Sequence, residues 1–469
     1  MEHLGYPAYV LFLVLLAGGL LALFRPYPAF LFAVVLFDVP MVYNAVNTRT
    51  PFLGPYFNLY DALFVVVLLA LIMDPRSRPL ALPRPVFWIL LIISWSVFQI
   101  FLDYNINYLV IRAIRWSITF PLAFFLGANL VVDKSRAKLF FFAIIAGSVL
   151  GAMRSFLSYQ QAVALAQYGE QSVRMGTAGT ILGGSFLVAA TQQSFFPLAS
   201  RFKKILWGAA LILFGMTVLF GEWRSVYLAI LGSVIAMPFV LNRWRNMTRT
   251  VLMSVVGLPL ILLAIHLTLP TLNPAGFFER ITPLVRYVDK GVPEIAHYED
   301  QTRVNQIERE VEEWSKGNWF LGRGLNYNVF LSDGLDKRIA WGHIEYISDL
   351  SNFGLVGLLI LGIYLPWRIF RAARFLYDRE PQDPVGLLGL TAIATVLQIS
   401  IISFMSAGYT SVNMHTVGFF YGAIWALAYG KSPDYNFVTS GMGYLNPGKK
   451  LMPINSVGRP FRPRSIEKS

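Results

Sequence analysis

Cysteine is absent from this 469-residue chain, and only five histidines occur in it. The absence of cysteine excludes disulfide bonds, thiolate metal sites and cysteine nucleophiles. Several common site motifs are missing too: there is no glycine-rich phosphate loop, no HExxH pair and no paired-aspartate motif of the kind that holds a metal-bound nucleotide sugar. A metal-dependent mechanism therefore finds no support in the sequence, and we expect no cofactor.

Charged residues are also scarce. They make up 14% of the chain, whereas about 25% is usual in soluble domains. Hydrophobic residues reach 56% and the mean hydropathy is +0.55. This composition predicts a polytopic membrane protein.

The net charge of +13 reflects topology and does not indicate a nucleic-acid partner. Residues 271–350 hold 9 basic and 13 acidic side chains, whereas the rest of the chain holds 30 basic and 13 acidic ones. The basic residues gather in short connections between apolar runs and in the last 40 or so residues. Cytoplasmic loops carry such an excess of Lys and Arg. We therefore expect the basic tail in the cytoplasm and the acidic segment outside.

About 12–13 transmembrane helices are expected, since a span needs about 20 apolar residues. Candidate runs lie at 7–24, 27–43, 53–73, 86–102, 110–131, 139–157, 178–199, 205–221, 225–241, 251–268, 351–370, 384–407 and 411–430. The chain accordingly divides into N-terminal transmembrane helices (1–150), a second transmembrane set (151–267), a large outward loop (268–350), C-terminal transmembrane helices (351–430) and a basic cytoplasmic tail (431–469).

The outward loop is too long to be a passive connection. It contains a helical stretch, 302–315, in which Val304, Ile307, Val311 and Trp314 fall on one face. We expect this face to dock on the bundle. A turn-rich strip, Asn-Trp-Phe-Leu-Gly-Arg-Gly at 318–324, follows it.

Arginines on the outer side of the membrane require an explanation, because the positive-inside bias depletes arginine there. Guanidinium groups bind phosphate oxygens in bidentate fashion and stay charged at all working pH values. A cluster of them at the membrane surface suits a lipid-linked phosphate or diphosphate, although each could instead pair with a loop carboxylate or a lipid headgroup. The candidates are Arg174, Arg224, Arg280, Arg286, Arg303 and Arg323.

His343 lies at the end of the outward loop, shortly before an apolar run begins near Gly354 and Gly357. A neutral imidazole can accept a proton from a sugar hydroxyl near pH 7. Glu345, two residues later, could fix its tautomer. A structural or helix-capping histidine is the alternative.

Four patches together resemble the O-antigen ligase and polymerase superfamily of bacterial envelope glycosyltransferases. They are the junction 221–231 around Arg224, the run from Arg303 through the strip 318–324, the His343 segment with its two following glycines, and Arg174 with Gly176. The resemblance covers roughly residues 170–430, and the first 150 residues match only in their pattern of spans. Trp223, Ile344 and the pair Trp319-Phe320 depart from the family pattern.

The resemblance implies an all-α helical bundle of about twelve spans in the bacterial inner membrane, with an outward-facing cavity under the large loop. It also implies transfer of a glycan from undecaprenyl diphosphate to a glycan or lipid A core acceptor, with inversion and without a metal. On this interpretation Arg224 and Arg303 clamp the diphosphate and His343 acts on the acceptor hydroxyl. Arg174, Arg280, Arg323 and Glu345 would bind substrate or orient the histidine.

Other functions stay open at this point. Ligation, polymerisation and transfer to a protein hydroxyl all use this scaffold, and the sequence does not separate them. A secondary transporter of an anionic or lipid-linked substrate is the alternative from a different class. Transporters tend to show two related halves and charged or broken helices at the membrane midplane. Here the polar residues gather in one outward loop.

Overall fold

The structure is a computed structural model in which part of the chain is described. The described residues are 19, 25–37, 59–74, 80–103, 108–166, 180–192, 201–221, 224–242, 307–308, 310–312, 314–315, 317–324, 329–332, 335–339, 345–381, 383–404 and 414–430.

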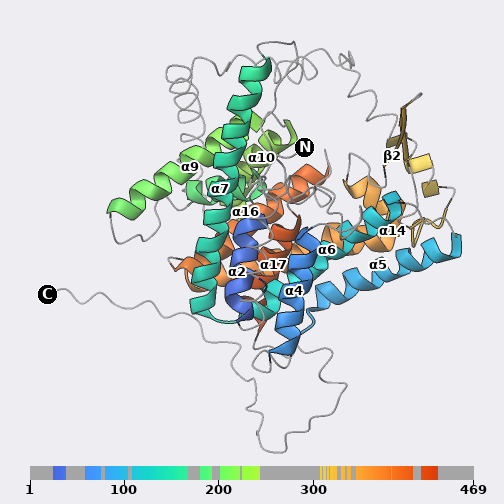
Figure 1. The fold of residues 1–469 in the computed structure, drawn as a ribbon, viewed down its shortest axis with the longest axis horizontal. Coiled ribbons are helices and arrows are strands. Elements are labelled where there is room, and N and C mark those ends of the chain that lie inside the picture. Colours follow the sequence, from blue (N-terminus) through green and yellow to red (C-terminus); the bar gives the residue numbers. More distant parts are fainter. Residues whose placement is uncertain are drawn as a thin grey trace, which may run out of the picture.

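Helices dominate the described residues (Figure 1). They are α2 (Pro26–Phe37), α4 (Leu59–Met73), α5 (Arg84–Asp103), α6 (Tyr108–Leu130), α7 (Lys134–Ala166), α8 (Thr180–Gln192), α9 (Arg201–Gly221), α10 (Arg224–Val240), α14 (Glu345–Leu358), η3 (Leu359–Tyr364), α15 (Leu365–Arg379), α16 (Pro384–Ser403) and α17 (Met414–Tyr429). These helices fall on the apolar runs of the sequence, since such runs satisfy their backbone groups internally as helices.

A small antiparallel pair of strands adds to the predicted all-α fold. Strands β1 (Val329–Ser332) and β2 (Leu335–Ile339) pair with Val329 opposite Ile339, and the register shifts after Phe330. Both strands belong to the segment predicted as the outward loop. The structure is thus helical with one two-stranded element in this loop.

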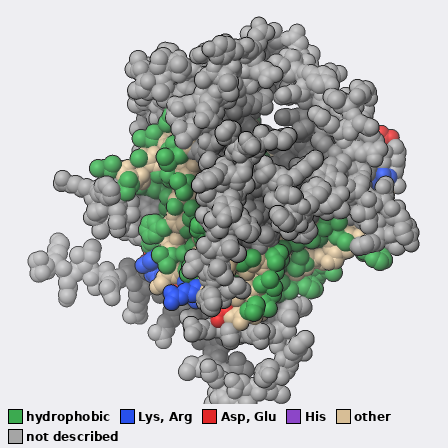
Figure 2. Space-filling model, viewed as in Figure 1, with side chains coloured by type: hydrophobic (Ala, Val, Ile, Leu, Met, Phe, Trp, Pro, Cys, Tyr) green, Lys and Arg blue, Asp and Glu red, His purple; other side chains and the backbone are tan. Residues whose placement is uncertain are grey.

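Three described helical segments are long and apolar enough to cross a membrane: Lys134–Met153, Tyr346–Arg379 and Pro384–Ser403. Hydrophobic side chains cover much of the described surface on the face drawn in Figure 2, and Lys and Arg side chains gather at its lower left. Such an apolar exterior suits contact with lipid. The chain is a helical membrane protein, whereas the number of spans and the side of the large loop stay predictions.

The helix after the predicted outward loop is longer than the expected span at 351–370. Helical structure runs from Glu345 to Arg379 through α14, η3 and α15. The added residues on both sides of the predicted run include charged ones, Asp349 before it and Arg371 and Arg374 after it, which the hydropathy pattern left out. Two irregularities interrupt the helix: Gly354 has non-helical dihedral angles, and η3 is a π-helical turn.

Glycines allow α6 and α17 to pack with their backbones in contact. A Cβ on Gly422 would lie 2.0 Å from the carbonyl oxygen of Phe124, and one on Gly127 would lie 2.2 Å from that of Phe419. Gly418 and Gly422 form a Gly-x-x-x-Gly pair on α17, a pattern that permits close helix contact in membranes. The sequence contains this signal, but we did not predict the contact from it.

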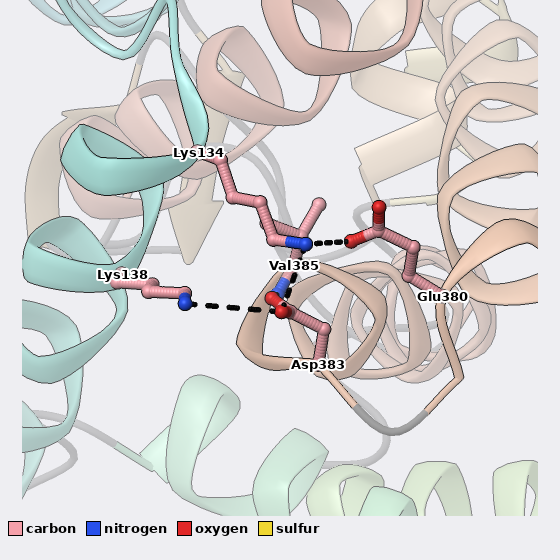
Figure 3. A network of polar contacts seen from close by, with 5 residues as sticks. All are labelled: Lys134, Lys138, Glu380, Asp383 and Val385. Atoms are coloured by element: carbon pink, nitrogen blue, oxygen red, sulfur yellow. Dashed lines mark hydrogen bonds and ion pairs between the residues drawn. The ribbon is translucent and has the colours of Figure 1, made fainter.

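Ionic contacts join the start of α7 to the turn between α15 and α16 (Figure 3). Lys134 Nζ lies 2.7 Å from Glu380 Oε2 and 3.0 Å from Asp383 Oδ2, and Lys138 Nζ lies 3.8 Å from the same Asp383 oxygen. Asp383 also caps α16, because its Oδ1 accepts a hydrogen bond from Val385 N at 3.1 Å. These contacts place the first turns of α7 and α16 at the same end of the bundle.

Candidate functional site

The strip 318–324 is a tight turn built on two glycines. Gly322 and Gly324 have φ of +72° and +80°, a region that other residues rarely adopt. Asn318 closes the turn, because its Oδ1 accepts hydrogen bonds from Phe320 N and Leu321 N, both at 3.0 Å. Gly322 N also donates to the Asn318 carbonyl at 2.7 Å. The local sequence thus fixes the shape of the strip.

The strip is bonded along its length to α14. Four main-chain hydrogen bonds of 2.8–3.1 Å join them, from the N–H groups of Arg323 and Gly324 to the carbonyls of Ser351 and Asn352, and from the N–H groups of Leu355 and Val356 to the carbonyls of Trp319 and Phe320. The strip therefore bonds with N–H and carbonyl groups of α14 that a regular helix would pair within itself.

Gly354 is the break in α14 that makes this possible. Its φ of 68° and ψ of −166° lie in a region that is essentially restricted to glycine. A Cβ on Gly354 would lie 2.4 Å from Gly322 N, and one on Gly322 would lie 2.4 Å from Gly354 N. The two glycines thus meet backbone to backbone. Both belong to motifs that the sequence analysis selected, and the structure brings these motifs together.

Buried polar side chains surround this contact. Glu310 and Asp349 are only 2% and 1% exposed, and Ser348, Ser351 and Asn352 are equally buried. Ser348 Oγ donates to Glu310 Oε2 at 3.4 Å. This bond links the described residues of the helix near 310 to the first turns of α14. Buried carboxylates are costly unless hydrogen bonds or charges compensate them.

The helical stretch near 310 buries a residue outside its predicted apolar face. Residues 307–308, 310–312 and 314–315 are helical as expected, and of the predicted face Ile307 and Trp314 are half-buried whereas Val311 is 41% exposed. Glu310, which the apolar periodicity did not select, is buried. Its hydrogen bond from Ser348 gives the reason, because the buried surface of α14 in this region is itself polar and accommodates a carboxylate.

Two further helices support the start of α14. Gln99 of α5 donates through Nε2 to the Gly322 carbonyl at 3.4 Å. The Tyr346 hydroxyl donates to the Ser400 carbonyl of α16 at 3.3 Å, and the Tyr346 ring contacts that of Phe404 edge to face at 4.6 Å. The strip is thus bonded to α5 and the start of α14 to α16.

Arg323 is the one predicted site residue whose side chain the structure describes. It is half-buried, and a Cβ on Gly317 would lie 2.8 Å from its Cγ and Nε, so its stem runs across that glycine. Its backbone N–H donates to the Ser351 carbonyl at 2.9 Å. Arg323 is therefore fixed beside α14, the helix that begins two residues after His343.

The other predicted site residues are described in part or not at all. Arg224 is the first residue of α10 and Glu345 is the first residue of α14, and for both the structure describes the backbone alone. The remaining predicted residues, His343, Arg303, Arg174, Arg280 and Arg286, lie outside the described residues. Their roles stay predictions.

The sequence analysis missed the buried polar group around Glu310, Ser348 and Asp349. A signal for it was present: Ser348, Asp349, Ser351 and Asn352 interrupt the approach to an otherwise apolar run. Polar side chains at a membrane helix face the interior of the bundle or water, which could have indicated their burial.

Among the described residues there is no group of three or more His, Asp or Glu side chains that could hold a metal ion. Because His343 and most of the predicted outward loop are not among them, the metal-independent mechanism stays a prediction. Comparisons with known protein families and with curated proteins give no match to this chain.

Proposed function

We propose that this protein transfers a glycan from undecaprenyl diphosphate to an acceptor hydroxyl at the outer surface of the bacterial inner membrane, as an O-antigen ligase or polymerase does. The observation that supports it most is the junction between the strip 318–324 and the break in α14 at Gly354. Two motifs that the family resemblance selected, about 30 residues apart in sequence, form one contact.

The junction gives the proposed roles a physical basis. It fixes the backbone of Arg323 against α14, the helix that begins two residues after His343 in the sequence. Arg224 at the start of α10 and Arg303 before the helix near 310 are the proposed diphosphate clamp, assisted by Arg174 or Arg280. Bidentate guanidinium contacts suit diphosphate oxygens.

The reaction is a displacement at the anomeric carbon. The acceptor oxygen attacks that carbon from the face opposite the diphosphate, and the bond between the carbon and the diphosphate oxygen breaks with its electron pair on the leaving group. His343 takes the acceptor proton, and Glu345 fixes the imidazole tautomer. The arginines stabilise the charge that develops on the leaving diphosphate, the part that a divalent cation plays elsewhere.

The test is transfer in vitro by the purified full-length protein in detergent with EDTA. An undecaprenyl diphosphate-linked oligosaccharide is supplied either alone or with lipid A core. Product on lipid A core establishes a ligase, and a ladder from donor alone establishes a polymerase. Folded protein that gives neither product contradicts both activities and directs attention to a protein acceptor and then to transport.

Variants test the roles separately. Arg224→Ala, Arg303→Ala and His343→Ala should each lower transfer at least about 100-fold, since removal of one group that stabilises developing charge costs that much. Arg371→Ala is the matched control, because Arg371 is an exposed arginine on α15. The turn that follows α15 carries the ionic contacts of Figure 3. Transfer close to wild type in a variant of the first group contradicts the role given to that residue.

A further inference from the structure

Two aromatic side chains on the strip 318–324 are exposed although they are held rigidly. Trp319 is 56% exposed and Phe320 is 48% exposed. Their rings meet edge to face, with centroids 5.8 Å apart and an interplanar angle of 75°. Large exposed apolar groups on an ordered segment mark interaction sites more often than chance positions. We call this pair the Trp319–Phe320 corner.

The backbone beneath the corner is fixed on both sides. The Trp319 carbonyl accepts hydrogen bonds from Leu355 N and from Trp314 Nε1, both at 3.1 Å. The Phe320 carbonyl accepts from Val356 N at 3.1 Å, and Phe320 N donates to Asn318 Oδ1. Little backbone entropy is left for a ligand to remove, so a preorganised surface of this kind binds at a lower entropic cost.

The helix and strip next to the corner carry several exposed polar side chains. Glu308, Glu312, Ser315 and Asn318 are exposed on the neighbouring helix and strip. A carboxylate is unfavourable next to lipid tails, so these neighbours argue for a hydrated ligand. A ligand that carries apolar C–H faces and many hydroxyl groups matches an aromatic surface with a polar rim. Pyranose rings have both properties.

We propose that the Trp319–Phe320 corner is a carbohydrate-binding subsite, on which one sugar ring stacks while its hydroxyl groups face the polar rim. The identity of the bound glycan rests on the proposed function. The subsite places this sugar next to Arg323.

Binding is measured without any transfer step. Saturation-transfer NMR on the full-length protein in detergent uses cellotetraose, maltotetraose and chitotetraose at millimolar concentration as probes. Transfer of saturation to the axial ring protons of at least one probe is expected for the wild type. Trp319→Leu should abolish it, and Trp319→Phe should retain part of it, because the planar ring is what matters. The proposal is overturned if no probe receives saturation from the wild type, or if the probes receive as much saturation from Trp319→Leu as from the wild type.

A matched control separates stacking from anchoring in the membrane interface. Trp367 on α15 is 57% exposed and stacks with Phe370 at 6.0 Å, so it resembles the corner in exposure and in having an aromatic partner. Trp367→Leu should leave saturation transfer unchanged. An interface anchor would tolerate leucine at position 319 as well as at 367, an outcome that also overturns the proposal.

A kinetic arm links the subsite to the reaction. In the transfer assay, Trp319→Leu should raise the KM for the glycan about five- to tenfold and change kcat less than about twofold, because the ring binds substrate away from the reacting bond. If the probes bind through Trp319 but the wild type transfers no glycan, the subsite stands and the proposed function is contradicted. If the wild type and Trp319→Leu transfer glycan with the same kinetic constants, the subsite alone is contradicted.

Discussion

Gly354 is the single residue on which the strip and α14 most depend. Its backbone region excludes side chains, and a Cβ there would also lie 2.4 Å from atoms of Gly322 and Phe320. Gly354→Ala should therefore lower the free energy of unfolding by about 3 kcal/mol or more. Thermal unfolding in detergent checks this.

The control for that substitution is Gly215→Ala on α9, where a Cβ would meet nothing within 4 Å. Alanine is the better helix former by about 0.5–1 kcal/mol, so this variant should be as stable as the wild type or slightly more so. Equal unfolding midpoints for Gly354→Ala and Gly215→Ala would contradict the role of the glycine contact.

Glu310 tests how a buried carboxylate holds the helix near 310 against α14. Glu310→Ala removes the carboxylate that accepts the hydrogen bond of the buried Ser348 hydroxyl and should destabilise the protein by about 1–3 kcal/mol. Glu310→Gln keeps an oxygen that can accept the bond, so its cost should be smaller.

A double-mutant cycle with Ser348→Ala isolates this hydrogen bond. The two alanine variants should be non-additive by about 0.5–1.5 kcal/mol, the usual range for one hydrogen bond. Additive effects in denaturation measurements would mean that Glu310 is held by other contacts.

At the scale of elements, the contact between α6 and α17 depends on the absence of side chains. Gly422→Ala places a methyl group 2.0 Å from the Phe124 carbonyl oxygen, so the two helices must separate. We expect a loss of about 2–4 kcal/mol, because overpacking a tight interface costs this order of energy. The same change at Gly208, where a Cβ is unopposed, should be neutral. The difference between their unfolding midpoints is the measurement, and no difference would refute the close contact.

The turn between α15 and α16 gives the stability a pH dependence. Burial disfavours the ionised form of Asp383, but the hydrogen bond from Val385 and the Lys134 ammonium outweigh it, so its pKa is lowered from the ordinary value of 3.8. The folded pKa thus lies below the unfolded one. The stabilisation is complete above the unfolded value and is lost as the pH falls through the folded value.

Wild-type protein should therefore lose part of its stability as the pH falls below about 4, whereas Asp383→Asn should lose less over the same range. The unfolding midpoint, followed against pH at low salt, measures this. Because these side chains are partly exposed, 1 M salt should weaken the effect. Parallel pH profiles for the two proteins would exclude Asp383 as the group responsible.

For the whole molecule, the sequence predicted helix positions well where composition alone determines them. The apolar run 384–407 corresponds to α16, whose start is marked by the Asp383 cap and Pro384. The glycines at 322, 324 and 354 were also informative, because each needs a backbone that other residues avoid. Their mutual contact could not be predicted, since it joins segments about 30 residues apart through backbone atoms.

Failures occurred where tertiary contacts override a local pattern. The apolar stripe that includes Val311 did not predict the burial of Glu310, which follows from the polar surface that α14 presents there. The predicted run 351–370 is shorter than the helix, because charged residues such as Asp349 before it and Arg371 after it lower the local hydropathy although the helix continues through them. Of the predicted site residues, Arg323 alone could be placed as a side chain.

The packing of α17 on α6 has a consequence for how the protein is made. Ribosomes deliver the chain to the membrane from its N-terminus, so α6 is inserted long before its partner helix is synthesised. The face of α6 around Gly127 is then covered by lipid or by an assembly factor until the last described helix is inserted. The contact between α6 and α17, which are far apart in sequence, therefore forms late in biogenesis. A chain that stops before residue 414 should be a substrate for membrane proteases, however well its earlier helices insert.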